Sequence, residues 1–127
     1  MEQEQTQGLK PVICIDRKKE RIRIHRQTLN LMGRPEYIQL LVNPDKGMFA
    51  LRGSFKGDHL AHRIRKSFFT SDNCYEIYSK HLMQALVRVN GGLLEDQSYR
   101  IYGEMIPMAG IARFDLNDLV LLGEESE

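Results

Sequence analysis

The chain has 127 residues, of which 42% are hydrophobic and 28% charged, and its formal net charge is +1. This length and composition predict one compact domain and exclude a disordered protein. No uncharged stretch, such as Met105 to Ala112, is long enough to span a bilayer. The acidic, polar start MEQEQTQG is unlike a secretory signal, and Cys14 and Cys74 form no CxxC pair. We therefore expect a cytoplasmic protein with no membrane association, disulfide bond or zinc finger.

The modest net charge hides an uneven distribution along the chain. From Lys10 to Lys66, 14 lysines and arginines stand against 5 acidic residues, whereas from Ser67 onward 4 stand against 10. This division suggests an anionic partner for the first half, or head-to-tail self-association. Two solvated faces without any partner are the alternative.

The first half reads as a series of short strands around one short helix. Residues 1–9 lack periodicity and are predicted to form a flexible N-terminal segment. After a β-rich run at 12–15 and a turn at 16–20, residues 21–25 (RIRIH) alternate polar and apolar side chains, which predicts a strand with one buried and one positively charged face. The remaining predicted elements are a helix at 27–32 ended by Gly33, a strand at 36–42, the turn NPDKG and a strand at 48–52.

Two segments of the second half leave alternatives open. Residues 59–69 fit either a short helix or a strand. Residues 73–90 fit either one continuous helix or a strand at 74–78 followed by a helix at 80–90 that Ser79 caps. The chain then predicts a strand at 99–106, a turn at 107–110, a strand at 111–116, an apolar segment at 117–122 and an acidic tail at 123–127.

The version with a strand at 74–78 produces an internal repeat of strand, short helix, strand, turn and strand. In this repeat Ile24 matches Ile77, Leu29 matches Leu82 and Tyr37 matches Tyr99. We therefore predict an α+β, mainly β fold in a single domain at 10–122. Two strand–short helix–β-hairpin half-units, a basic one at 10–56 and an acidic one at 67–122, would form a pseudo-two-fold barrel. The predicted shared core contains Ile22, Ile24, Leu40, Val42, Ile77, Leu82, Ile101 and Phe114.

The first half resembles the swapped-hairpin transcription regulators of the AbrB type. Arg21, Ile24, Met32 and Gly33 fall at the spacing of that family, and EYIQLLVNPDKGMFALR is similar to its closing hairpin. The repeat within one chain is similar to MraZ-like proteins, in which two such units share a chain. The resemblance covers residues 12–52 and, in outline, 74–116, and it implies a DNA-binding regulator.

The chain departs from the family pattern at positions that bear on DNA contact. Glu20 replaces the glycine before the arginine, and His25 replaces the proline after the isoleucine. The arginine pair of the family's helix falls on Leu29 and Asn30. Only Arg21 carries over among the family's basic contacts, whereas Arg23 and Arg26 are particular to this chain.

Six cations lie within ten residues around the predicted strand at 21–25. A β-structure with arginines on one face can neutralise phosphates and read bases in a major groove. A solvated edge strand whose charges oppose aggregation is the alternative. The predicted nucleic-acid-binding residues are Arg17, Lys18, Lys19, Arg21, Arg23 and Arg26.

Signals of catalysis are missing from the sequence. His59 and His62 are three residues apart, but only Asp58 lies beside them and no motif supplies a third metal ligand. There is no GxxxxGK[ST], GxSxG, HExxH or Rossmann glycine pattern. We therefore predict no enzyme activity, no catalytic residue, no metal and no cofactor.

Two functions from different classes follow from these observations. The first is a small DNA-binding regulatory protein with duplex DNA as its partner. The second is a non-enzymatic protein-binding module of phage or mobile-element type, whose acidic second half masks a charged partner. In either case we expect a monomer with an internal pseudo-dimer, or a homodimer.

Overall fold

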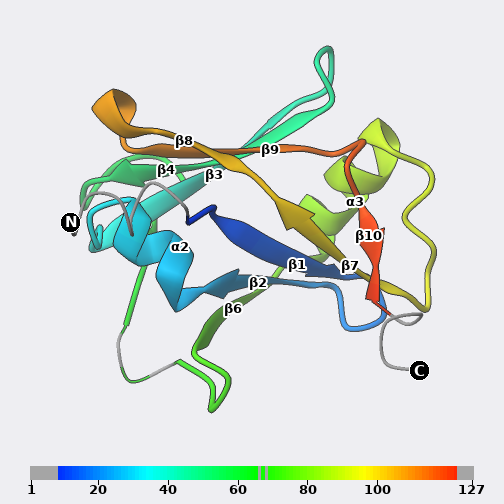
Figure 1. Cartoon of the computed structure of the whole chain (residues 1–127), viewed down its shortest axis with the longest axis horizontal. Helices are drawn as coiled ribbons and strands as arrows, with labels where there is room; N and C mark the ends of the chain where they lie inside the picture. Colours follow the sequence, from blue (N-terminus) through cyan, green and yellow to red (C-terminus); the bar gives the residue numbers. More distant parts are fainter. Residues whose placement is uncertain (1–8, 66, 68, 123–127) are drawn as a thin grey trace.

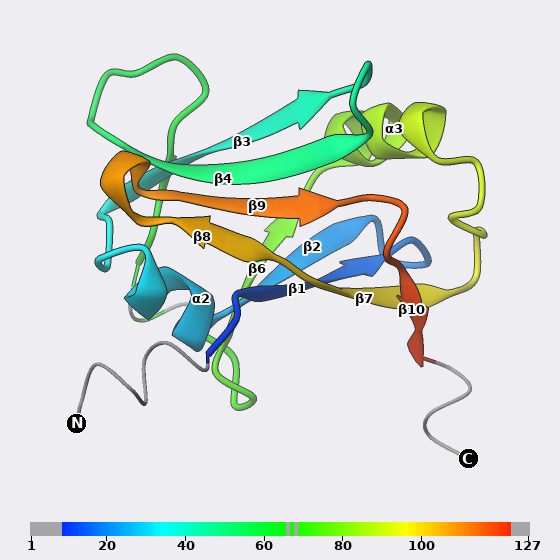
Figure 2. The ribbon, with the colours of Figure 1, turned by 45° about the horizontal axis from the view of Figure 1, so that its top comes forward.

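The structure is a computed structural model that describes residues 9–65, 67 and 69–122 (Figure 1). The predicted flexible segment at 1–9, apart from Leu9, and the acidic tail at 123–127 lie outside these residues. Within them the chain is mainly β, with two short helices, as expected for an α+β fold. Two five-stranded antiparallel sheets are present (Figures 1 and 2). No closed barrel is found among the described residues.

The first sheet has the strand order β10–β7–β1–β2–β6. Its central hairpin joins β1 to β2, and β6 pairs with β2 although some fifty residues separate them. Ile13, Ile15, Ile22 and Ile24 point from this hairpin into the core. The bounds are β1 (Val12–Asp16), β2 (Arg21–His25), β6 (Cys74–Tyr78), β7 (Ser98–Tyr102) and β10 (Val120–Leu121).

The second sheet has the order β5–β3–β4–β9–β8 and is built around the predicted NPDKG hairpin. Gly47 closes that turn with φ of 64°, a conformation that glycine adopts without steric cost. The bounds are β3 (Tyr37–Asn43), β4 (Met48–Ser54), β5 (His62–Arg63), β8 (Glu104–Ile106) and β9 (Ile111–Asp115). Of the described residues in the segment 59–69, His62 and Arg63 form β5, so the predicted strand is confirmed at these two positions alone. Residues 66 and 68 of this segment lie outside the described residues.

Each of the two helices follows a strand of the first sheet. Helix α2 (Arg26–Leu31) follows β2 and ends before Gly33, whose φ of 88° fits the predicted helix stop. Helix α3 (Lys80–Val89) follows β6, and the Ser79 hydroxyl accepts a hydrogen bond of 3.0 Å from the Leu82 N–H. The second prediction for residues 73–90 is thus confirmed, because Ser79 adopts extended backbone and caps the helix.

The predicted strand at 99–106 is in fact two strands in different sheets. The chain passes from β7 in the first sheet to β8 in the second at Gly103 (Figure 2). A Cβ atom at Gly103 would lie 2.6 Å from Phe114 Cδ1 and would also collide with the Arg113 carbonyl oxygen. The missing side chain lets the two sheets approach closely at this crossing.

One continuous hydrophobic core joins both sheets and both helices. Five of the eight predicted core residues are buried, namely Ile22, Ile24, Ile77, Ile101 and Phe114. The other three, Leu40, Val42 and Leu82, are partly buried and pack against this core. No helix in the described part of the chain is long and apolar enough to cross a membrane.

Candidate nucleic-acid interface

The structure distributes the six predicted cations over three places. Arg21 and Arg23 lie on the outer face of the first sheet, and Arg17, Lys18 and Lys19 lie in the turn between β1 and β2. Arg26 begins helix α2, at the far end of β2 from that turn. A five-residue strand spans about 17 Å, so the turn and Arg26 are separate sites of positive charge.

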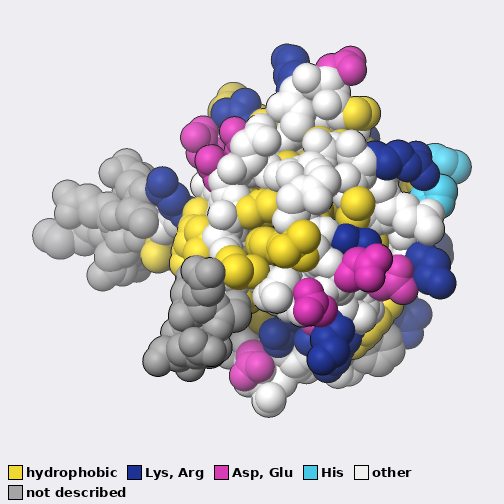
Figure 3. Space-filling model, turned by 90° about the vertical axis from the view of Figure 1, so that its right-hand side faces the viewer, with side chains coloured by type: hydrophobic (Ala, Val, Ile, Leu, Met, Phe, Trp, Pro, Cys, Tyr) yellow, Lys and Arg dark blue, Asp and Glu magenta, His cyan; other side chains and the backbone are white. Residues whose placement is uncertain are grey.

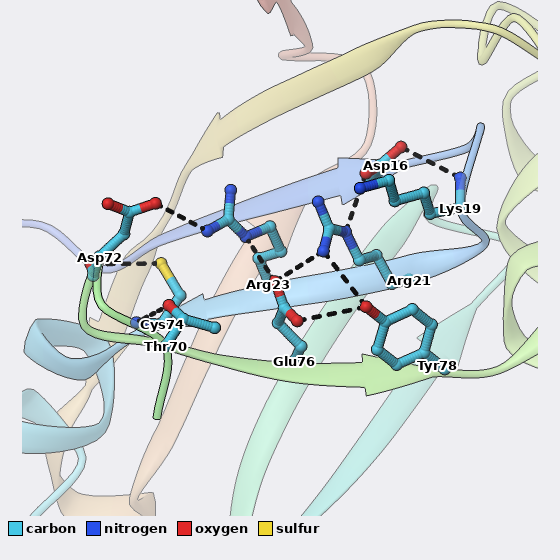
Figure 4. Close-up of polar contacts among 9 residues, drawn as sticks. All are labelled: Asp16, Lys19, Arg21, Arg23, Thr70, Asp72, Cys74, Glu76 and Tyr78. Carbon is cyan, nitrogen blue, oxygen red and sulfur yellow. Dashed lines mark hydrogen bonds and ion pairs between the residues drawn. The ribbon is translucent and has the colours of Figure 1, made fainter. Parts of the chain in front are cut away.

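Arg21 is bonded to carboxylates on both neighbouring strands (Figure 4). Its Nε donates to Asp16 Oδ2 at 2.8 Å and its Nη1 donates to Glu76 Oε2 at 2.7 Å. Burial alone would lower the pKa of Arg21, but hydrogen bonds to Tyr78 and Asp16 and the charges of Glu76 and Asp16 raise it overall. The guanidinium is therefore charged and already neutralised, with 14% of its side chain exposed.

Arg23 shares the same glutamate with Arg21. Glu76 lies directly opposite Arg23 in the β2–β6 register, and Arg23 Nε is 3.2 Å from Glu76 Oε2. Asp72 adds a second contact, at 3.4 Å from Arg23 Nη2. The predicted positively charged face is wrong in this respect, because β6 and β1 bring Glu76 and Asp16 onto it. We call this group of Asp16, Arg21, Arg23, Asp72 and Glu76 the ion-pair ladder.

The two cysteines are free thiols on the strands that flank β2, Cys14 on β1 and Cys74 on β6. Cys14 is half-buried, because it points to the opposite face of β1 from Ile13 and Ile15. Cys74 is buried, and burial raises the pKa of its thiol although the nearby Arg23 charge opposes this shift. A buried thiol with a raised pKa is a poor nucleophile, so Cys74 fits a structural role.

The β1–β2 turn presents its two lysines to solvent. Lys18 and Lys19 are exposed, and in the part of the chain that the structure describes their ammonium groups form no ion pair. Arg17 instead holds the turn in place, since its Nη1 donates to the Leu93 carbonyl and its Nη2 lies 4.0 Å from Glu95 Oε1. Arg17 is thus a positioning residue, and the lysines are the accessible cations.

Helix α3 adds cations that sequence reasoning missed. Lys80, Gln84 and Arg88 are exposed and spaced by four residues, so they share one helix face. Lys18 and Arg88 line one hollow of about 650 Å³ between the turn and α3. The sequence does indicate this positively charged helix face, because no acidic residue lies between Glu76 and Glu95.

The surface around this hollow carries both signs of charge. Glu20 and Glu95 also line the hollow. On one side of the molecule, lysine and arginine side chains lie among acidic ones around an apolar patch (Figure 3). Around this hollow, the accessible positive charge therefore lies on the turn and on the α3 face.

Comparisons with family models, with curated proteins and with solved structures find no match for this chain.

Proposed function

We propose that the chain is a small, non-enzymatic regulatory protein that binds duplex DNA through the β1–β2 turn and the exposed face of α3. The observation that carries this proposal is the acid-free face of α3 beside two lysines that form no ion pair with any residue the structure describes. The four contacting cations are Lys18, Lys19, Lys80 and Arg88.

The dimensions of α3 suit this role. A helix of ten residues is about 15 Å long, and a major groove about 12 Å wide admits an α-helix. Lysines and arginines on its flank would contact phosphates, and Gln84 can form a bidentate pair with adenine. The ladder arginines stay within the fold in this proposal, and their predicted contact with DNA remains a separate prediction.

We also propose that the fold consists of two half-units related by a pseudo-two-fold axis, as in the swapped-hairpin regulators. One unit is β2–α2–β3–β4 and the other is β6–α3–β7/β8–β9. Support comes from pairing between corresponding strands, β2 with β6 and β4 with β9. Gly47 and Gly110 end the corresponding hairpin turns with φ of 64° and 63°. Counting back from these glycines aligns the buried Ile38 with the buried Ile101, one residue from the predicted Tyr37–Tyr99 match.

The DNA-binding proposal is tested by fluorescence anisotropy with a labelled duplex of about 25 base pairs at several salt concentrations. Four phosphate contacts predict a slope of about −3 to −4 for log affinity against log salt, or about a 100-fold loss between 50 and 200 mM. Lys18→Ala with Lys19→Ala should reduce the slope by about two units, and so should Lys80→Ala with Arg88→Ala.

The matched control is Arg52→Ala on the second sheet, where the exposed arginine bonds Gln39. This variant should leave both affinity and slope unchanged. A wild-type protein without affinity for duplex DNA at 50 mM salt contradicts the proposal.

The second candidate function is a protein-binding module, and the ion-pair ladder favours it. Arg21 and Arg23, two of the six predicted cations, already have carboxylate partners within the fold. What is left is a surface of mixed charge, which is typical of protein interfaces with complementary partners. If the anisotropy titration shows no binding of duplex DNA, the protein-binding function becomes the leading candidate. The acidic second half of the chain is then its expected contact surface.

A further inference from the structure

A groove of about 560 Å³ lies between α2 and the side chains of Ile64 and Phe69, and none of the proposed DNA-contacting residues lines it. Its floor is apolar and includes Leu29, Ile64 and Phe69. Its rim is polar and carries Arg26, Asn30 and Arg34, which are all exposed. A hollow with an apolar floor and a few convergent polar groups is the usual form of a binding site.

The rim of this groove carries unneutralised positive charge. Arg34 follows the helix stop with φ of 54°, and in the described part of the chain its guanidinium has no carboxylate partner. The Arg26 guanidinium lies 4.5 Å from the centroid of the Phe69 ring and also lacks a carboxylate partner there. Glu36 is the acidic residue of the lining, and its Oε1 lies 4.0 Å from Arg63 Nε. The groove therefore favours an anionic ligand.

The aromatic residue of the floor is already engaged within the fold. Arg26 covers the Phe69 ring, and Tyr75 packs against the same ring at 5.8 Å in edge-to-face geometry. Binding of single-stranded nucleic acid depends on aromatic faces on which bases stack. Phe69 offers little such surface, and the phosphates of a duplex gain nothing from an apolar floor. The two observations together favour a peptide.

We propose that the α2 groove binds an acidic peptide segment of a partner protein, in which a large aliphatic side chain lies next to carboxylates. The aliphatic side chain packs on Leu29 and Ile64, beside the covered Phe69 ring. The carboxylates accept charge-assisted hydrogen bonds from Arg26 and Arg34, for which arginine's fork of donors is suited. None of the four proposed DNA-contacting cations lines this site. Peptide binding in the groove and DNA binding can therefore be tested separately.

The test titrates the full chain into three labelled, end-capped hexapeptides at 50 mM salt. The probe alternates leucine with glutamate, one control replaces glutamate by glutamine, and the other replaces leucine by serine. We expect the leucine–glutamate peptide to bind at least about tenfold more tightly than either control. The glutamine control lacks the carboxylates that bind the arginines, and the serine control lacks the aliphatic side chains that pack on the groove floor. Equal binding of the probe and either control overturns the proposal, and so does absence of binding.

Variants locate the site on the protein. Arg34→Gln should weaken binding of the probe about tenfold, and its exposed position predicts an unchanged unfolding temperature. Arg26→Gln also removes the contact with Phe69, so its unfolding temperature is measured beside its affinity. Arg52→Gln, an exposed arginine of the second sheet, is the matched control and should bind as the wild type does. Unchanged affinity in Arg34→Gln, or displacement of the probe by duplex DNA, contradicts the proposal.

Discussion

At the scale of single residues, neighbouring arginines of one strand differ in what they can do. Arg21 and Arg23 are bonded to Asp16 and Glu76, and Asp16 is itself buried. Lys19, only two residues before Arg21, faces solvent. A cation contributes to phosphate binding only if its charge is not already compensated, so proximity in sequence does not make these residues equivalent.

Replacing Arg21 by alanine should therefore destabilise the fold. The substitution leaves the buried Asp16 carboxylate and Glu76 without a principal partner, which should lower the free energy of unfolding by about 2–4 kcal/mol. Urea denaturation followed by circular dichroism measures this change. Lys19→Ala is the control and should stay within about 0.5 kcal/mol of the wild type. Similar stabilities of the two variants would contradict the structural role of the ladder.

At the scale of elements, local signals predict the strands and helices better than their connections between sheets. The alternation of RIRIH and the NPDKG turn correspond to β2 and to the β3–β4 hairpin. The segment at 99–106 looks like one strand, because its apolar pattern continues through Gly103. Its division between two sheets depends on the close approach of Gly103 to Arg113 and Phe114. These two residues lie further along the chain but are adjacent to Gly103 in space.

Gly103→Ala should be strongly destabilising for this reason. The added methyl group meets the Arg113 backbone and the buried Phe114 ring, and overpacking of this kind costs about 1–3 kcal/mol or more. Thermal unfolding by calorimetry measures the effect. Gly91→Ala is the matched control, since a Cβ atom there meets no heavy atom within 4 Å and Gly91 is not at positive φ. An unfolding temperature of Gly103→Ala equal to that of Gly91→Ala would contradict the tight crossing.

At the scale of the whole molecule, both halves of the chain contribute to one core. Ile24 comes from the basic half and Ile101 from the acidic half, and both are fully buried in the same cluster. The pairing of β2 with β6 and of β4 with β9 joins the halves at two places. Neither half can bury its apolar face alone, which predicts that they unfold together.

Ile24→Ala and Ile101→Ala should each lower the free energy of unfolding by about 2–5 kcal/mol, the usual cost of truncating a buried isoleucine. Each variant should still show one cooperative transition, with fluorescence of the tyrosines and far-ultraviolet circular dichroism changing at the same urea concentration. Two separate transitions, or a variant that loses structure in one half alone, would show that the halves are independent domains.

The sequence by itself determined the local elements of this protein. These elements depend on signals that act over a few residues and can be recognised without the rest of the chain. The signals are the period-two alternation, the NPDKG turn, the Ser79 cap and the Gly33 stop. Five of the predicted core residues are buried for the same reason, since they occupy the apolar phase of these elements. Only the tertiary structure decided which charges are accessible. Strand pairing brings Asp16 and Glu76 next to Arg21 and Arg23. Lys18 and Arg88 are far apart in the sequence but line the same hollow. Charge compensation depends on distance in space, which the order of residues along the chain does not specify.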